Sequence, residues 1–328
     1  MRQFSELLVK LLDYCEMHCV MCGQLSQAGR RAVLSLENLR EYFRNHTFVG
    51  KRVYLWGGEP LLHPELDQII SFFKEKGALV AMNTNGYKLD RHIDRLIASG
   101  LDRIIFSMDG SDAITHDSIR GVPGSFDKLV ANINLVHTTA LTPLIRINFV
   151  VLPLNYKQVL KVIDWSSRNG VYRMHFQLPI FLTPAQLNAY ANIVRTECGC
   201  AARNYGAFVM KFDGVDFSAL EQIMQTVYER HRDFARFYPF ERLNASDLRT
   251  YFTTDNSLKD CRCDVLEEKL AIDASGRFVT CPDFPDISYG NLAGGMTNPE
   301  RLDWLRERFM TGERLPICNR CCHFVPHH

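Results

Sequence analysis

A regular alternation of short, β-rich apolar runs with amphipathic segments fills residues 7 to about 180, and it restricts the fold more than any other feature. The apolar residues of segments 64–76 and 126–137 recur at helical spacing. The six expected strands cover residues 7–14, 52–57, 79–85, 103–109, 144–152 and 173–179. Because strands that alternate with helices form parallel sheets, the pattern predicts an α/β fold, a partial (β/α)6 TIM barrel with its helices outside.

The alternation stops after residue 180. Helical patterns follow over 184–198 and 217–237, and residues 269–272 and 278–280 around Gly276 are typical of a β-hairpin. We expect three parts. They are a barrel over 1–182, a bridging region over 183–258 that covers the barrel mouth and contributes to substrate selectivity, and a C-terminal domain over 259–328.

Composition excludes several classes of protein. The chain has 328 residues, of which 46% are hydrophobic and 23% charged, so we expect a large core rather than disorder. Lys and Arg number 38 against 37 Asp and Glu, which leaves no overall charge to recruit nucleic acid. No run approaches the roughly 18 apolar residues of a membrane helix, and the N-terminus lacks an export signal. We expect a cytoplasmic protein with neither nucleic acid nor a membrane as partner.

The cysteines indicate a metal centre. Eleven cysteines in a chain of this size, without an export signal, favour metal thiolates over disulfides. Cys15, Cys19 and Cys22 form a C-x3-C-x2-C motif that supplies only three thiolates. A structural zinc ion takes four ligands, whereas a four-iron cluster held by three cysteines leaves one iron open. Taken alone, the motif is also compatible with part of a zinc site.

Three further motifs lie where expected strands end. They are Gly-Gly-Glu-Pro at 57–60, Asn-Thr-Asn-Gly at 83–86 and Ser-Met-Asp-Gly at 107–110. Parallel barrels carry their reactive loops at the carboxyl ends of the strands. The motifs are therefore candidates for one site at the barrel mouth, although any one of them alone is equally typical of a tight turn.

In this order on successive βα units, the cysteine motif and the three strand-end motifs resemble the radical S-adenosylmethionine (SAM) superfamily. The resemblance implies that Cys15, Cys19 and Cys22 bind a 4Fe-4S cluster whose open iron takes the amino and carboxylate groups of SAM. It implies further contacts to SAM from Met21, Gly57, Gly58, Glu59, Asn85, Ser107, Asp109, Arg120, Asn148 and Leu178.

Within that set, the glycines let the backbone approach the methionine ammonium, and Glu59 supplies a counter-charge. Asn85, Ser107 and Asp109 are expected near the ribose and carboxylate of SAM. Arg120 can pair with the carboxylate, although a solvated helix charge is the other interpretation. Asn148 and Leu178 are weaker candidates for the ribose and adenine, and Met21 stands where relatives often have an aromatic residue.

A second cysteine set lies near the C-terminus. Cys263, Gly276 and Cys281 form a C-x12-G-x4-C pattern, and Cys318 and Cys321 form C-x2-C. The pattern resembles the auxiliary-cluster domains called SPASM or, in the shorter form expected here, twitch. The resemblance implies a 4Fe-4S cluster closed by these four thiolates, with Cys261 as an alternative ligand and Cys322 as a further competing sulfur. A structural zinc ribbon is the other interpretation of the spacing.

The resemblance implies reductive cleavage of SAM to a 5′-deoxyadenosyl radical, with the electron supplied by a donor such as flavodoxin or ferredoxin. Hydrogen abstraction then leads to oxidation or to epimerisation, for which Cys198, Cys200 and Cys322 are candidate hydrogen donors. Only fourteen residues precede Cys15, which favours a small polar metabolite such as a sugar or aminocyclitol. Modification of a ribosomally made peptide, and a non-catalytic metal-binding or redox-sensing protein, are the alternatives.

Overall fold

The computed structural model describes residues 4–23, 31–139, 144–255, 261–321 and 323–326, and the statements below concern these residues. The strands are β1 (Glu6–Lys10), β2 (Arg52–Trp56), β3 (Leu79–Thr84), β4 (Arg103–Ser107), β5 (Leu144–Val150), β6 (Arg173–Gln177), β7 (Ala235–Tyr238), β8 (Cys261–Cys263), β9 (Lys269–Ile272), β10 (Arg277–Val279), β11 (Ser288–Asn291), β12 (Gly295–Met296) and β13 (Phe324–Pro326). The α-helices are α1 (Leu36–Tyr42), α2 (Leu66–Glu75), α3 (Ile93–Ala98), α4 (Ala113–Arg120), α5 (Ser125–His137), α6 (Val159–Arg168), α7 (Pro184–Cys198), α8 (Phe217–His231), α9 (Ala245–Thr253), α10 (Asp264–Glu268) and α11 (Glu300–Met310). Short 3-10 helices include η2 (Pro60–Leu62) and η6 (Pro316–Arg320).

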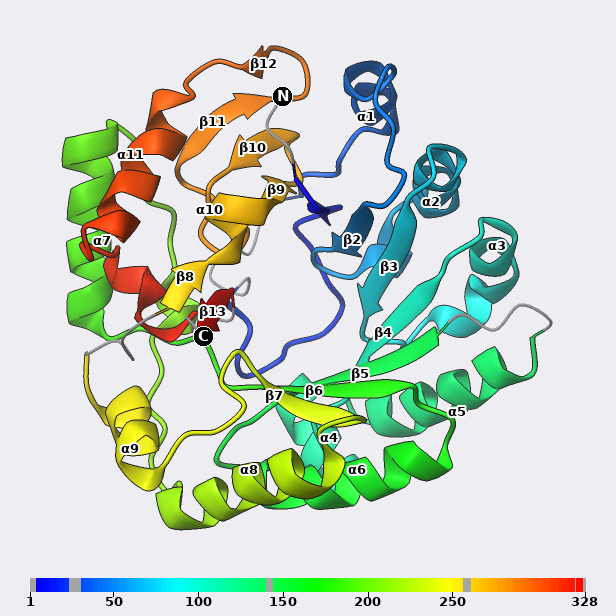
Figure 1. Cartoon of the computed structure of the whole chain (residues 1–328). Helices are drawn as coiled ribbons and strands as arrows, with labels where there is room; N and C mark the ends of the chain where they lie inside the picture. Colours follow the sequence, from blue (N-terminus) through cyan, green and yellow to red (C-terminus); the bar gives the residue numbers. More distant parts are fainter. Residues whose placement is uncertain (1–3, 24–30, 140–143, 256–260, 322, 327–328) are drawn as a thin grey trace.

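One curved sheet organises the molecule. Its strand order is β12-β11-β10-β9-β1-β2-β3-β4-β5-β6-β7, and all neighbours from β9 to β7 run parallel. In Figure 1 these strands curve around a common centre, with α1 to α6 and α8 on the outside. The predicted partial α/β barrel is therefore confirmed, and the structure adds parallel strands on both sides of the six expected ones.

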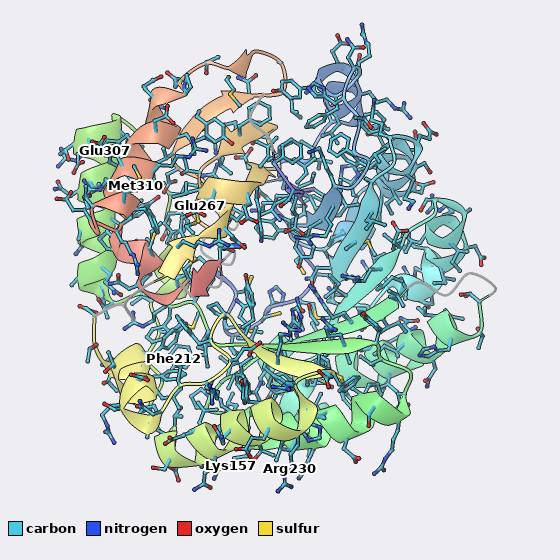
Figure 2. The ribbon with its side chains drawn as sticks, viewed as in Figure 1. Lys157, Phe212, Arg230, Glu267, Glu307 and Met310 are labelled. Atoms are coloured by element: carbon cyan, nitrogen blue, oxygen red, sulfur yellow. The ribbon has the colours of Figure 1, made fainter. Side chains whose placement is uncertain are left out.

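The strands have two chemically different faces. Residues such as Val53, Ile147 and Phe176 are fully buried and point outward into an apolar core beneath the helices. Their neighbours along the strands, such as Tyr54 and Asn148, border the inner space of the barrel. Figure 2 shows side chains packed between sheet and helices, with Lys157, Arg230 and Glu307 on the outer surface. The polar inner face is what makes the barrel interior available for binding.

The expected helix over 217–237 is wrong at its end. The helix α8 stops at His231, and Ala235–Tyr238 forms β7, which pairs in parallel with β6. The reason is the alternation in this short segment. Ala235 and Phe237 are each 1% exposed, and the Phe237 ring packs 5.3 Å from that of Phe176. Burial of this pair against the barrel core outweighs continuation of the helix.

The C-terminal segment joins the same sheet. Strands β9 and β10 form the predicted antiparallel hairpin, and β9 also pairs in parallel with β1. Strands from all three expected parts thus share one hydrogen-bonded sheet, and the division at residues 182 and 258 stays a prediction. Among the described residues, no helix has the length and apolarity required to span a bilayer.

Candidate functional site

The three N-terminal cysteines border a cavity of about 610 Å³ at the carboxyl ends of the barrel strands. Most of the residues predicted to bind the cofactor border the same cavity. They are Met21, Gly57, Gly58, Glu59, Asn85, Ser107, Arg120 and Asn148, together with Cys15, Cys19 and Cys22. The strands bring together residues that are far apart in the chain, as the strand-end positions of the motifs predict.

Neighbouring donors point at the cysteine sulfurs. The Met17 N–H lies 3.4 Å from Cys15 Sγ, and Asn85 Nδ2 lies 3.7 Å from the same atom. Arg120 donates to Cys19 Sγ at 3.6 Å. Without a metal, burial raises the pKa of the Cys15 thiol. Donors and a guanidinium around buried sulfurs favour thiolates, so this donor set fits a metal cluster held through its cysteines.

The cysteine loop is held against the end of α4. The N–H groups of His18 and Val20 donate to the carbonyls of Arg120 and Ile119, at 3.1 and 2.9 Å. Gly121 ends the helix in the left-handed region (φ +71°), and a Cβ at this position would lie 2.7 Å from the His18 carbonyl oxygen. Only glycine therefore combines this backbone conformation with the close approach of the cysteine loop.

The Gly57-Gly58 pair supports the loop from the other side. The Gly58 N–H donates to the Leu12 carbonyl at 2.9 Å, and the Glu59 N–H donates to the Tyr14 carbonyl at 3.0 Å. A Cβ on Gly58 would lie 1.7 Å from that same Tyr14 oxygen. In the structure, Gly58 therefore packs against the backbone that leads into Cys15. The sequence did not predict this role.

Glu59 is buried at the centre of the site. Its carboxylate accepts hydrogen bonds from Thr84 Oγ1 at 2.6 Å, from the Asn85 N–H at 2.8 Å and from the Leu61 N–H at 3.0 Å. Burial raises the pKa of Glu59 to about 7, although these bonds oppose the shift. The carboxylate therefore fixes the Asn-Thr-Asn-Gly turn and also presents a titratable group to the cavity.

Asp109 and Arg120 are partners of each other. The Asp109 side chain is fully buried, accepts from the Val150 N–H at 2.7 Å and lies 2.5 Å from Arg120 Nη2. Asp109 is absent from the cavity lining, unlike Arg120. Leu178 is likewise absent from the lining and lies in the apolar core with 3% exposure. Cofactor contacts of these residues stay predictions, and the structure assigns Asp109 the position of a support for Arg120.

Several residues that line this cavity were not proposed as site residues from the sequence. Asn83 accepts from Asn148 Nδ2 and donates to Ser107 Oγ, both at 3.4 Å, so three strands share one polar chain. Trp56 and Gln177 border the same cavity. Each lies on the inner side of its strand, and the two-residue alternation from a recognised residue such as Ser107 or Asn148 is the signal that points to this face.

The second cysteine set comes together in the structure. Cys263, Cys281, Cys318 and Cys321 border one small cavity of about 20 Å³, next to His323. Burial raises the pKa of the Cys263, Cys281 and Cys318 thiols. Four half-buried cysteines are a donor set that fits iron–sulfur or zinc ligation. The space matches roughly one water, so a four-iron cluster requires these side chains to lie farther apart. The Cys261 side chain and Cys322 lie outside the described residues.

Across the described ranges, no three His, Cys, Asp or Glu side chains are grouped around a single metal-ion position. The candidate hydrogen donors are placed elsewhere. Cys198 ends α7, and Cys200 donates to its carbonyl at 3.4 Å. Neither residue borders the cavity of the first cysteine set.

Comparison with known proteins agrees with this geometry. The model of the Radical SAM superfamily matches residues 9–166. An AdoMet-dependent heme synthase from Methanosarcina barkeri is 30% identical over 173 residues, which are 52% of this chain and 48% of that protein. A probable GTP 3′,8-cyclase from Saccharolobus islandicus is 32% identical over 176 residues, which are 53% of this chain and 56% of that protein. The aligned region thus spans about half the length of these curated relatives.

Two solved structures have a similar fold. Streptococcus suis SuiB bound to S-adenosylmethionine superposes with a TM-score of 0.63 at 17% identity, over 97% of this chain and 72% of that one. Native anSMEcpe with bound AdoMet superposes with a TM-score of 0.62 at 17% identity, over 90% and 80%. With its cysteine triad and strand-end motifs on one cavity and a family match over residues 9–166, this chain carries a radical SAM domain.

Proposed function

We propose that this chain is an enzyme that cleaves SAM at the Cys15, Cys19 and Cys22 site and dehydrogenates a small polar substrate bound inside the barrel. The observation that carries the proposal is the shared cavity. Three cysteines and most of the predicted cofactor contacts border one space of about 610 Å³ at the carboxyl ends of the strands. Members of the superfamily bind a 4Fe-4S cluster and SAM.

The residues of the first site divide into two groups. Cys15, Cys19 and Cys22 would hold a 4Fe-4S cluster, which supplies the electron for cleavage of SAM to a 5′-deoxyadenosyl radical when both are bound. Glu59 supplies a negative charge for the methionine ammonium, and Ser107 and Asn148 supply hydrogen bonds for the ribose. The inner faces of the strands hold the substrate close by and keep water from the radical.

Dehydrogenation also needs an acceptor for a second electron. The substrate loses one hydrogen atom to the 5′-deoxyadenosyl group, then one proton and one electron. An auxiliary cluster on Cys263, Cys281, Cys318 and Cys321 would take that electron. His323 borders both the first cavity and the cavity of these cysteines, so the two cysteine sets are neighbours. This adjacency supports oxidation.

Epimerisation receives less support. It requires a hydrogen donor beside the substrate, and neither Cys198 nor Cys200 borders the cavity of the first site. Burial also raises the pKa of Cys198 to about 11. We expect Cys198→Ala and Cys200→Ala to leave product stereochemistry unchanged. Incorporation of solvent deuterium at the reacting carbon, lost in either variant, would instead establish epimerisation.

Anaerobic reconstitution tests the proposal. We expect about eight irons per chain for two 4Fe-4S clusters, and formation of 5′-deoxyadenosine from SAM with dithionite. Cys15→Ala should lose about four irons and SAM cleavage together. A flavodoxin or ferredoxin is the natural electron donor under this proposal and should replace dithionite. Bound zinc in place of iron, or SAM left intact by the reduced wild type, would refute it.

A further inference from the structure

Four arginines lie on the inner faces of four consecutive strands. Arg103 is on β4, Arg146 on β5, Arg173 on β6 and Arg236 on β7. Arg146 is the register partner of both Ile105 and Arg173, and Arg236 is the register partner of His175. Because residues paired in register point to the same face, the four side chains form one row. The Nε atom of each is buried and has no hydrogen-bond partner among the described residues.

Part of this row borders a second large cavity, of about 670 Å³, toward the amino-terminal ends of the strands. Its charged lining includes Arg52, Arg103, Arg146 and Lys269. Tyr54, Asn148 and Gln177 border both this cavity and the one at the cysteines. The two cavities therefore adjoin inside the barrel.

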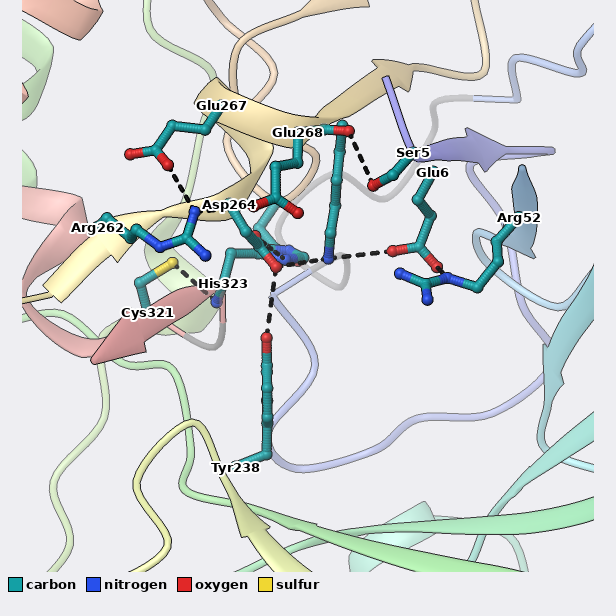
Figure 3. Close-up of polar contacts among 12 residues, drawn as sticks. Ser5, Glu6, Arg52, Tyr238, Arg262, Asp264, Glu267, Glu268, Cys321 and His323 are labelled. Atoms are coloured by element: carbon teal, nitrogen blue, oxygen red, sulfur yellow. Dashed lines mark hydrogen bonds and ion pairs between the residues drawn. The ribbon is translucent and has the colours of Figure 1, made fainter. Parts of the chain in front are cut away.

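The carboxylates of this cavity are already engaged by other cations. The two oxygens of Glu6 lie 3.3 Å from Arg52 Nε and 3.1 Å from Lys269 Nζ. Figure 3 shows Glu6 between Arg52 and the group around Asp264 and Tyr238. Burial alone would raise the pKa of Glu6, but Lys269 and Arg52 hold it below its usual range. Asp102 similarly accepts from Lys74 Nζ and from the Val80 N–H, each at 2.7 Å.

Neither Arg103 nor Arg146 is paired directly with these carboxylates, although the charge of Glu6 acts on Arg146. Within the described part of the chain neither side chain makes a hydrogen bond or an ion pair. Arg173 packs over the Tyr172 ring, and Arg236 has Glu241 at 3.7 Å. A buried Nε atom without a hydrogen-bond partner is costly, and a bound anion would offset that cost.

The neighbouring histidine reports the same excess of positive charge. Burial lowers the pKa of His175 to about 3, and Arg146, Arg236, Arg173 and Arg103 lower it further. His175 is therefore neutral at physiological pH and adds no charge of its own. Burial likewise lowers the pKa of Arg146, Tyr54 and Glu6 oppose this shift, and Arg103 and Arg173 add to it. Each of these groups would gain from a bound anion.

We propose that the amino-terminal half of the barrel interior binds an oxyanion group of the substrate, a phosphate or a carboxylate, through Arg103 and Arg146. The planar guanidinium presents parallel N–H groups that match the oxygens of either group. This inference rests on the proposed function, because a substrate held at Arg103 and Arg146 would extend toward the adjoining cavity of the first cysteine site. It narrows the substrate class from small and polar to small and anionic.

Binding of simple anions tests the site without knowledge of the substrate. The reconstituted full chain, saturated with SAM in the absence of reductant, is titrated calorimetrically with inorganic pyrophosphate in one arm and with citrate in the other. The variants are Arg103→Gln and Arg146→Gln. The control is Arg168→Gln, because Arg168 is exposed on α6 and pairs with Asp164 at 2.7 Å. Iron content and circular dichroism establish that each variant folds.

We expect saturable binding of at least one probe to the wild type and to Arg168→Gln. Arg103→Gln and Arg146→Gln should each weaken anion binding about tenfold or more, which is the effect of one charge-assisted hydrogen bond. Preference for pyrophosphate indicates a phosphorylated substrate, and preference for citrate indicates a carboxylated one. If one variant fails to fold, the other decides, because the two arginines lie on different strands. The inference would be overturned if neither probe bound the wild type, or if Arg103→Gln and Arg146→Gln bound the probes as tightly as the wild type.

The same samples separate this inference from the proposed function. Adding dithionite to wild-type protein without substrate measures 5′-deoxyadenosine. SAM cleavage without anion binding refutes only the proposed anion site at Arg103 and Arg146. If anion binding depends on Arg103 and Arg146 but SAM is not cleaved, the anion site is supported. The same result refutes the proposed radical chemistry.

Discussion

The buried ion pair between Asp109 and Arg120 gives the sharpest test of how the cysteine loop is held. Asp109 is fully buried and lies 2.5 Å from Arg120 Nη2, while Nη1 of the same guanidinium donates to Cys19 Sγ at 3.6 Å. Two variants, Asp109→Asn and Arg120→Gln, each remove one charge and keep the approximate shape. Both leave the remaining charge buried without its partner.

The expected magnitude follows from the burial of both groups. Removing one member of a buried pair costs about 3–5 kcal/mol, because the other charge stays desolvated. In a chain of this size that corresponds to a decrease of roughly 4–7 °C in the unfolding temperature. The double variant leaves no isolated charge, so it should lose less than the sum of the single losses, by about 2 kcal/mol or more.

Thermal unfolding of the reconstituted protein under anaerobic conditions measures the three differences, and the Michaelis constant for SAM provides a second measurement. If Arg120 acts through its pairing, both single variants raise this constant to a similar extent. Additive losses, within about 0.5 kcal/mol, would refute the coupling. A higher Michaelis constant in Arg120→Gln alone would show that Arg120 contacts the cofactor directly, as the resemblance implies.

Three further predictions concern the two cysteine sites. Gly58→Ala should lose the iron of the first cluster, because the added Cβ would lie 1.7 Å from the Tyr14 carbonyl oxygen. The control Gly294→Ala should keep this iron, because its Cβ would have no neighbour nearer than 3.5 Å. Equal iron content in the two variants would contradict the reasoning. Glu59 has a folded-state pKa of about 7 against 4.5 for the ordinary group, so its protonated form contributes stability that is complete below pH 4.5 and is lost as the pH rises through 7. The unfolding temperature of SAM-free protein should therefore fall over this range by an amount equivalent to at most about 3 kcal/mol, and Glu59→Gln should flatten the profile; identical profiles would show that Glu59 does not titrate there. Cys318→Ala should lose about four irons and substrate oxidation but still form 5′-deoxyadenosine, and loss of SAM cleavage would argue against separate clusters.

Much of the site could be predicted from the sequence because its motifs end strands. In a parallel barrel all strand ends of one kind meet at one rim, so Cys15, Glu59 and Ser107 had to lie near one another once the strands were recognised. The strand assignment rested on alternation and on apolar runs, which depend on local sequence. The same reasoning identified the hairpin around Gly276.

The errors have a common origin in contacts between distant segments. Helical spacing continued past His231, but the burial of Phe237 against Phe176 made this segment a strand. The expected contact of Arg120 with the carboxylate of SAM stays a prediction, and the structure adds Asp109 as a partner of Arg120. Asn83 stood in the Asn-Thr-Asn-Gly motif without being proposed as a site residue, and Gln177 belonged to no motif; both became visible as members of the inner face.

By itself, the sequence determined the parallel barrel, the three-cysteine motif and the strand-end loops around it, because periodicity and spacing act within a few residues of the chain. Only the tertiary structure decided which charges find partners. Glu6 is shared between Arg52 and Lys269, Asp109 pairs with Arg120, and Arg103 and Arg146 are left facing the barrel interior. These outcomes depend on the register of strands from distant parts of the chain, which sets the distances between their side chains.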